Sequence, residues 1–100
     1  MPKSAYRSTP KVMNGYLYTN DAHTGTAVNS SAWFVWLALG QTFYYKTSVG
    51  SITARCEKRR NGFFWYAFRR RKGKLCKVYL GGSAYLTRNV LDSATARLAP

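Results

Sequence analysis

The chain has 100 residues, and its sixteen Lys and Arg against three Asp and Glu give a formal net charge of +13. The length fits one small domain, and 46% hydrophobic residues are enough to build a core. Asp21, Glu57 and Asp92 lie far apart in the sequence, which argues against a hydrolase that uses a carboxylate pair. His23 is the single histidine, which disfavours a metal cluster and a Cys/His relay. We therefore predict a protein that is not an enzyme and uses no cofactor or metal.

The excess of positive charge predicts a polyanionic partner, either nucleic acid or an anionic membrane surface. The longest apolar run, residues 32–39, is far shorter than the roughly 20 residues of a membrane-spanning helix. It is internal and has no basic flank on its N-terminal side, unlike a signal peptide. We expect a nucleic-acid partner, no membrane, and a cytoplasmic location with the nucleoid. A transit peptide is the competing interpretation of the basic residues before Asp21.

The N-terminal third of the chain has little hydrophobic periodicity and is rich in Ser, Thr, Asn and Gly. We predict a flexible basic arm over residues 1–30, followed by one nucleic-acid-binding domain over residues 31–100. Within the arm, two short apolar segments flank Asn14-Gly15, a dipeptide that suits the two positive φ angles of a tight hairpin turn. A hairpin over residues 11–18 and plain coil agree equally well with this pattern.

A short helix is predicted over residues 31–39. Ser30 and Ser31 come before the apolar residues 32–39 and can cap the first turn, and Gly40 suits the left-handed residue after the last turn. Trp33 and Trp36 share one face at helical spacing, although a strand is the alternative for so short a run. We expect this helix to cover the core. Docking of Trp33 and Trp36 on a larger protein or nucleoprotein assembly is the competing role.

From residue 41 onward the apolar pattern has a period of two, which predicts strands joined by short turns into an antiparallel meander. These strands cover residues 42–46, 51–58, 63–70 and 75–80. A 3.6-residue period returns after Gly82, where Thr87 suits the N-cap of a helix that extends through Leu98. The predicted fold is α+β: a three- to four-stranded antiparallel meander with a C-terminal helix packed on one face and a short preceding helix.

Alternation along the strands assigns the side chains to two faces of the sheet. Ile52, Ala54 and Cys56 share one parity, and we place them under the C-terminal helix with Trp65 and Ala67. The opposite parity leaves an open face of cations and aromatics. Its members are Arg55, Glu57, Arg59, Tyr66, Phe68, Arg70, Lys77 and Tyr79.

The basic residues are concentrated around this open face. Ten of the sixteen Lys and Arg, with a single acid, lie between residues 55 and 77, whereas a surface that serves only solubility would interleave both signs. Guanidinium groups bind phosphate or pair with guanine, and tyrosine hydrogen-bonds phosphate or stacks on bases. The predicted nucleic-acid-binding residues are Arg55, Arg59, Arg60, Tyr66, Phe68, Arg70, Arg71, Lys72, Lys74, Lys77 and Tyr79.

The two cysteines do not form a metal-binding pattern. Cys56 and Cys76 have no CxxC partner and no neighbouring histidine, which argues against zinc. In the absence of a secretion signal we favour two buried free thiols, and a single disulfide is the alternative.

Residues 50–98 resemble DNA-binding domains built from a three-stranded sheet and a helix. The resemblance rests on Trp65-Tyr66-Ala67-Phe68-Arg69-Arg70, Lys77-Val78-Tyr79-Leu80-Gly81, and Leu86-Thr87 before a Leu/Ala-rich helix. Such domains are the arm-type domains of tyrosine recombinases from mobile elements and the GCC-box-binding domains of plant ethylene-response factors. Residues 31–98 are also similar to a basic module that precedes the ATPase part of some LuxR-type bacterial regulators, in which a helix like Trp33 to Leu37 comes first.

This resemblance implies that the sheet face away from the helix enters the major groove of duplex DNA. It further implies a regulator or accessory factor of a bacterial or mobile-element system. Structured RNA in a ribonucleoprotein complex is the alternative partner, because exposed aromatics stack on unpaired bases. Carried over residue by residue, the DNA contacts would be Arg55, Arg59, Tyr66, Arg70, Lys77 and Tyr79.

Overall fold

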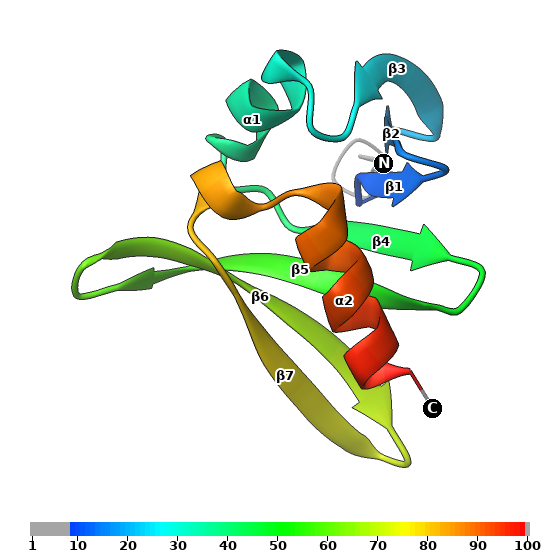
Figure 1. The fold of residues 1–100 in the computed structure, drawn as a ribbon, viewed down its shortest axis with the longest axis vertical. Coiled ribbons are helices and arrows are strands. Elements are labelled where there is room, and N and C mark those ends of the chain that lie inside the picture. Colours follow the sequence, from blue (N-terminus) through cyan, green and yellow to red (C-terminus); the bar gives the residue numbers. More distant parts are fainter. Residues whose placement is uncertain (1–8, 100) are drawn as a thin grey trace, which may run out of the picture.

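A computed structural model describes residues 9–99, which form one seven-stranded mixed sheet with its helices (Figure 1). The sheet order is β3-β2-β1-β4-β5-β6-β7, and all neighbouring strands are antiparallel except β1 and β4. The strands are β1 (Lys11–Met13), β2 (Tyr16–Thr19), β3 (Ala22–Ala27), β4 (Phe43–Thr47), β5 (Gly50–Arg59), β6 (Gly62–Arg71) and β7 (Lys74–Gly81). The helices are α1 (Ser31–Leu37), the 3-10 helix η2 (Ser83–Tyr85) and α2 (Arg88–Leu98).

The C-terminal part of the chain confirms the predicted meander and helix. β4 to β7 follow one another as antiparallel neighbours, and α2 packs against β5, β6 and β7. The Thr87 hydroxyl caps α2 by accepting a hydrogen bond from the backbone N–H of Val90. Leu91, Ala94 and Leu98 form its buried stripe, as the 3.6-residue period predicts.

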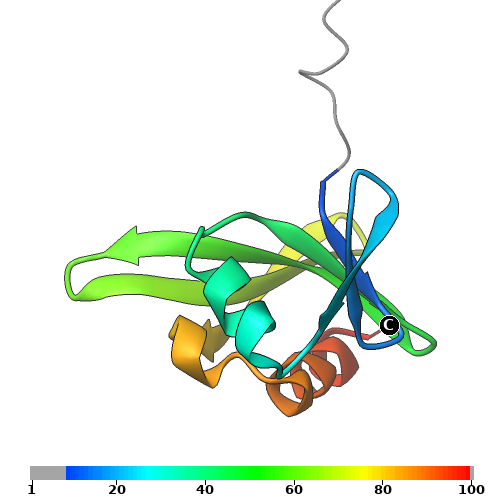
Figure 2. The same cartoon turned by 90° about the horizontal axis from the view of Figure 1, so that it is seen from above.

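The segment after Ser30 is a helix, and the alternative of a strand is wrong. The Ser30 hydroxyl accepts a hydrogen bond from the backbone N–H of Trp33 at 3.2 Å, which fixes the first turn of α1. Figure 2 shows α1 on the same side of the sheet as α2. Trp33 is fully buried there, and its indole Nε1 donates a hydrogen bond to the Leu86 carbonyl at 2.9 Å. Trp33 is therefore part of the core and offers no surface to a partner, and Trp36 packs partly buried against that core.

The N-terminal segment differs most from its prediction. The hairpin over residues 11–18 is present, and its turn residues Asn14 and Gly15 have φ of 54° and 81°. Asn20 and Asp21 make a second turn with positive φ, which leads into β3. The prediction of a flexible arm is thus wrong for residues 11–27. Residues 1–8 of that predicted arm lie outside the described residues.

The three N-terminal strands join the sheet through β1, which pairs in parallel with β4. Val12 lies opposite Tyr45 in this pairing, and both side chains are buried on the helix side of the sheet. Leu17 of β2 is also buried, whereas no side chain of β3 is. Two buried residues among these three short strands give too weak a hydrophobic pattern for recognition from the sequence.

The sequence left a disulfide between Cys56 and Cys76 open as an alternative to two free thiols. Cys56 and Cys76 are free, half-buried thiols, and burial raises the pKa of Cys56. Within residues 9–99 no three His, Cys, Asp or Glu side chains gather as a metal site would require. No helix in that part of the chain is long and apolar enough to cross a membrane.

Tyr45 connects β4 to α2 and makes the fold sensitive to alkaline pH. Its hydroxyl donates a hydrogen bond to Asp92, and burial, followed by that carboxylate, raises the pKa of Tyr45 above its ordinary value near 10. The protonated Tyr45 hydroxyl contributes fully to the free energy of unfolding below the ordinary pKa of tyrosine. This contribution is lost as pH rises above that ordinary pKa towards the higher pKa of the folded state. We expect the melting temperature to fall more steeply in the native chain than in Tyr45→Phe between about pH 9 and pH 11.5. Parallel curves for the two proteins in thermal melts would contradict this linkage.

Candidate nucleic-acid interface

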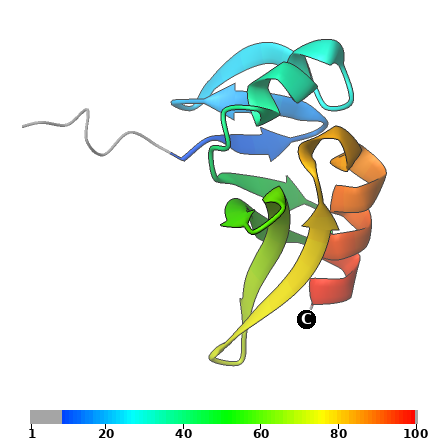
Figure 3. The same cartoon turned by 90° about the vertical axis from the view of Figure 1, so that its left-hand side faces the viewer.

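One face of β5–β7 is covered by neither α1 nor α2 (Figure 3). The strand register places seven predicted binding residues on this face. The register places Arg55 opposite Tyr66, and Tyr66 opposite Tyr79. Directly opposite residues share a face, whereas Ala54 and Ala67 of the alternate parity are buried on the helix side. We call the uncovered surface the basic face. It consists of Arg55, Arg59, Tyr66, Phe68, Arg70, Lys77 and Tyr79.

Three of the four cations of the basic face, Arg55, Arg59 and Lys77, lie above its aromatic rings. Lys77 Nζ is 4.3 Å from the centroid of the Tyr66 ring and 5.4 Å from that of Phe68. The Arg55 guanidinium lies 5.4 Å from the Phe68 ring, and that of Arg59 lies 5.0 Å from the Tyr66 ring. Attraction between a cation and the ring face holds the charges in position. Phe68 is only 8% exposed as a result, so it supports cations and does not offer a free stacking surface.

Glu57 organises two of these cations. Its Oε1 accepts hydrogen bonds from Arg59 Nη2 and from Lys77 Nζ, the latter at 3.3 Å. Arg59 Nε also donates to the Tyr66 hydroxyl at 3.2 Å, and this hydrogen bond raises the pKa of Arg59. One acid therefore holds two long side chains against the face and leaves their net charge positive.

No family model, curated protein or solved structure matches the chain. A functional assignment therefore depends on the chemistry of the basic face and on what surrounds it.

The remaining predicted binding residues are exposed but lie away from the basic face. Arg60 belongs to the turn between β5 and β6, and Lys72 to the turn between β6 and β7. These two turns lie at opposite ends of the ten-residue strand β6 and point in different directions (Figure 1). Arg71 and Lys74 lie opposite each other in the β6–β7 register, and their strand positions place both side chains on the side of the sheet that the helices cover. The structure thus gives a central basic face and two separate basic turns.

Two residues of β4 that are absent from the predicted set extend this open side of the sheet. Tyr44 lies opposite Thr53, and Lys46 lies opposite Ser51, so both share the parity of Arg55. Alternation within residues 42–46 could have identified them, because their neighbours Phe43 and Tyr45 are buried. Tyr16, Tyr18, His23 and Lys11 share this side too, but they lie in the segment that was interpreted as an arm.

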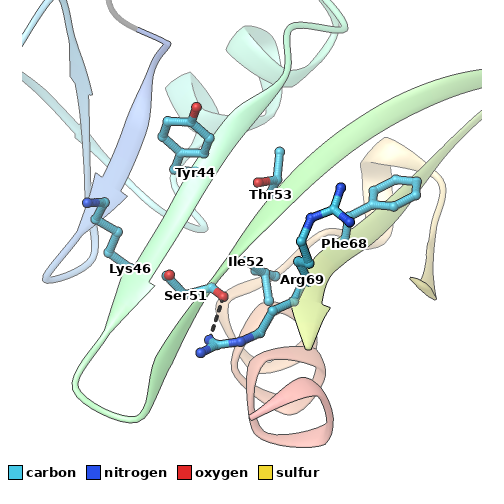
Figure 4. Close-up of a pocket in the computed structure, with 8 residues that line it drawn as sticks. Tyr44, Lys46, Ser51, Ile52, Thr53, Phe68 and Arg69 are labelled. Carbon is cyan, nitrogen blue, oxygen red and sulfur yellow. Dashed lines mark hydrogen bonds between the residues drawn. The ribbon is translucent and has the colours of Figure 1, made fainter. Parts of the chain in front are cut away.

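A groove of about 410 Å³ lies over Ser51 to Thr53 of β5, between β4 and the part of β6 that belongs to the basic face. It forms because β5 and β6 pair only from Thr53 opposite Phe68 onward, so that the two strands separate beyond this pair. Figure 4 shows Tyr44 and Lys46 on one side of the groove and Phe68 on the other. Arg69 spans the separation by donating a hydrogen bond from Nη1 to the Ser51 carbonyl at 2.9 Å.

Proposed function

We propose that the protein is a non-enzymatic DNA-binding protein that contacts duplex DNA through the basic face. The observation that carries this proposal is the layer of cations over Tyr66 and Phe68 on an uncovered sheet surface. Ring contacts and Glu57 restrict these cations before any ligand binds. Less side-chain entropy is then lost when they bind phosphates or guanine edges.

The dimensions of the sheet restrict how a duplex approaches. Seven strands spaced about 4.8 Å apart are roughly 29 Å wide, more than twice the width of the major groove, which is about 12 Å. Only the part of the sheet formed by β5–β7 can enter a groove. The β5–β6 hairpin and the β6–β7 hairpin project beyond the other strands (Figures 1 and 3). A ten-residue strand such as β6 is about 33 Å long, close to one turn of B-DNA at about 34 Å. The basic turns at its two ends can then contact phosphates of the same duplex.

The resemblance noted in the sequence supports the same mode of binding. The resemblance to recombinase arm-type domains and to the domains of ethylene-response factors implies three antiparallel strands with a helix on one face. β5–β7 and α2 have this arrangement. The implied contacts Arg55, Arg59, Tyr66, Arg70, Lys77 and Tyr79 are all on the basic face. A role as a regulator or accessory factor of a bacterial or mobile-element system follows from this resemblance.

The proposal predicts a strong dependence of affinity on salt. Neutralising about six phosphates releases counterions, so the logarithm of the association constant should fall with the logarithm of salt concentration at a slope near −5. Fluorescence anisotropy with a labelled blunt duplex, titrated at several salt concentrations, measures this slope. An affinity that stays constant between about 50 and 200 mM salt would exclude binding through phosphates.

Structured RNA is the second candidate ligand. Tyr79, at 59% exposure, leaves an uncovered ring at the edge of the basic face, and exposed rings suit unpaired bases. Competition between unlabelled duplex DNA and an unlabelled folded RNA at one salt concentration discriminates between the candidates. Displacement of the labelled duplex by DNA at lower concentration than by RNA supports the proposal, and the reverse order supports RNA.

A further inference from the structure

The open side of the sheet continues beyond the basic face across all seven strands. A row of directly opposite residues can be followed from the β3 edge to the β7 edge through each neighbouring pair. Side chains of such a row point to one side of the sheet. In sheet order, its members are His23, Tyr18, Lys11, Tyr44, Thr53, Phe68 and Lys77.

The N-terminal half of this surface has a chemistry different from that of the basic face. Tyr16 and Tyr44 are 41% and 40% exposed, and neither ring has a cation above it among the contacts of the described residues. His23 packs against Tyr16 and Tyr18, with ring centroids 4.9 and 5.0 Å apart, in an exposed aromatic cluster. We call Tyr16, Tyr18, His23 and Tyr44 the aromatic half.

The described residues of this half carry less positive charge than the basic face does. Lys11 forms an ion pair with Asp21 at 2.9 Å, and Lys46 is exposed at the groove. Among residues 9–99, these two cations and one acid provide little of the electrostatic attraction on which duplex binding depends. Exposed rings with a few cations beside them instead suit successive unpaired bases, which stack on aromatic side chains while the backbone meets the cations.

We propose that the aromatic half binds an unpaired nucleotide strand, so that the preferred ligand is a duplex that continues into a single-stranded segment. This inference rests on the proposed duplex binding by the basic face. The groove between β4 and the basic face marks the boundary between the two parts of the ligand. There Lys46 and Arg70, from opposite sides, can contact the backbone where the strands separate.

Matched ligands and variants test this inference by fluorescence anisotropy. The ligands are a blunt DNA duplex, the same duplex with an overhang of about six nucleotides of DNA or of RNA, and the overhang alone. The double variant Tyr16→Ala/Tyr44→Ala removes two exposed rings from the aromatic half. Tyr85→Ala is the control, because Tyr85 is 72% exposed in η2, away from this surface.

We expect the overhang to increase affinity about tenfold over the blunt duplex, which corresponds to about one stacked base. The double variant should lose this gain and keep its affinity for the blunt duplex, and Tyr85→Ala should keep both. Equal affinities for blunt and overhanging duplexes, or a gain that survives in the double variant, would overturn the inference. Binding of the overhang alone without binding of the blunt duplex would refute the proposed duplex function and, with it, the preference for a duplex that continues into a single strand, and would leave only strand binding by the aromatic half. Comparison of the DNA and RNA overhangs then identifies the type of strand.

Discussion

Replacement of Trp33 by alanine is expected to lower the free energy of unfolding by roughly 3–5 kcal/mol, the range for large aromatic residues in a core. Trp33 is fully buried, and its ring stacks on Trp36 and meets Phe43 edge-on at 5.4 Å. The alanine variant also leaves the Leu86 carbonyl without its indole donor. Native proteins are stable by only about 5–15 kcal/mol, so this one substitution should remove a large fraction of the stability and leave a variant that unfolds at much lower urea concentration.

Urea unfolding followed by circular dichroism measures this loss. Val35→Ala is the matched control, because Val35 lies on the same helix at 72% exposure and should change stability by no more than about 0.5 kcal/mol. Trp33→Phe keeps an aromatic ring and loses the hydrogen bond, so its stability should fall between those of the native chain and Trp33→Ala. A loss below about 1 kcal/mol for Trp33→Ala would show that α1 does not close the core.

Local signals predicted the C-terminal two thirds of the fold. Ser30 and Thr87 act as N-caps, and the alternating strands form the meander, because each of these features depends on residues close together in the sequence. The pairing of β1 with β4, in contrast, depends on residues far apart in the sequence. It joins Val12 to Tyr45 across more than thirty residues and a helix, and no short sequence window contains that relation.

Parity located the basic face correctly, but it could not give the arrangement of its side chains. Alternation places Phe68 on the open side, and only the structure shows Arg55 and Lys77 covering its ring. The position of Tyr44 beside the groove depends on where β5 and β6 separate, which is a property of three-dimensional register. Alternation in the sequence therefore placed the seven residues of the basic face on one side of the sheet, but it underestimated how far that open side extends.

The strongest effect on binding is expected from removing two charges of the basic face. Arg55→Gln/Lys77→Gln deletes two cations above Phe68, while the glutamine stems keep part of the ring covered. Each nucleic-acid contact contributes about 1–3 kcal/mol, so affinity for the blunt duplex should fall about 30-fold or more. If both residues contact phosphates, the salt slope should also become shallower by about 2.

The control for this variant has the same net charge on a different surface. Lys58→Gln/Arg97→Gln also removes two cations, but Lys58 has the opposite parity to Arg59, and Arg97 lies in the last turn of α2. General attraction of a basic protein to DNA would weaken binding equally in both double variants. Contact through the basic face requires a much larger loss in Arg55→Gln/Lys77→Gln, with thermal melts showing that both variants are folded. Equal losses of duplex affinity in the two double variants would mean that the total charge of the chain attracts DNA. The face of the sheet that carries Arg55, and not Lys58, would then have no part in recognition.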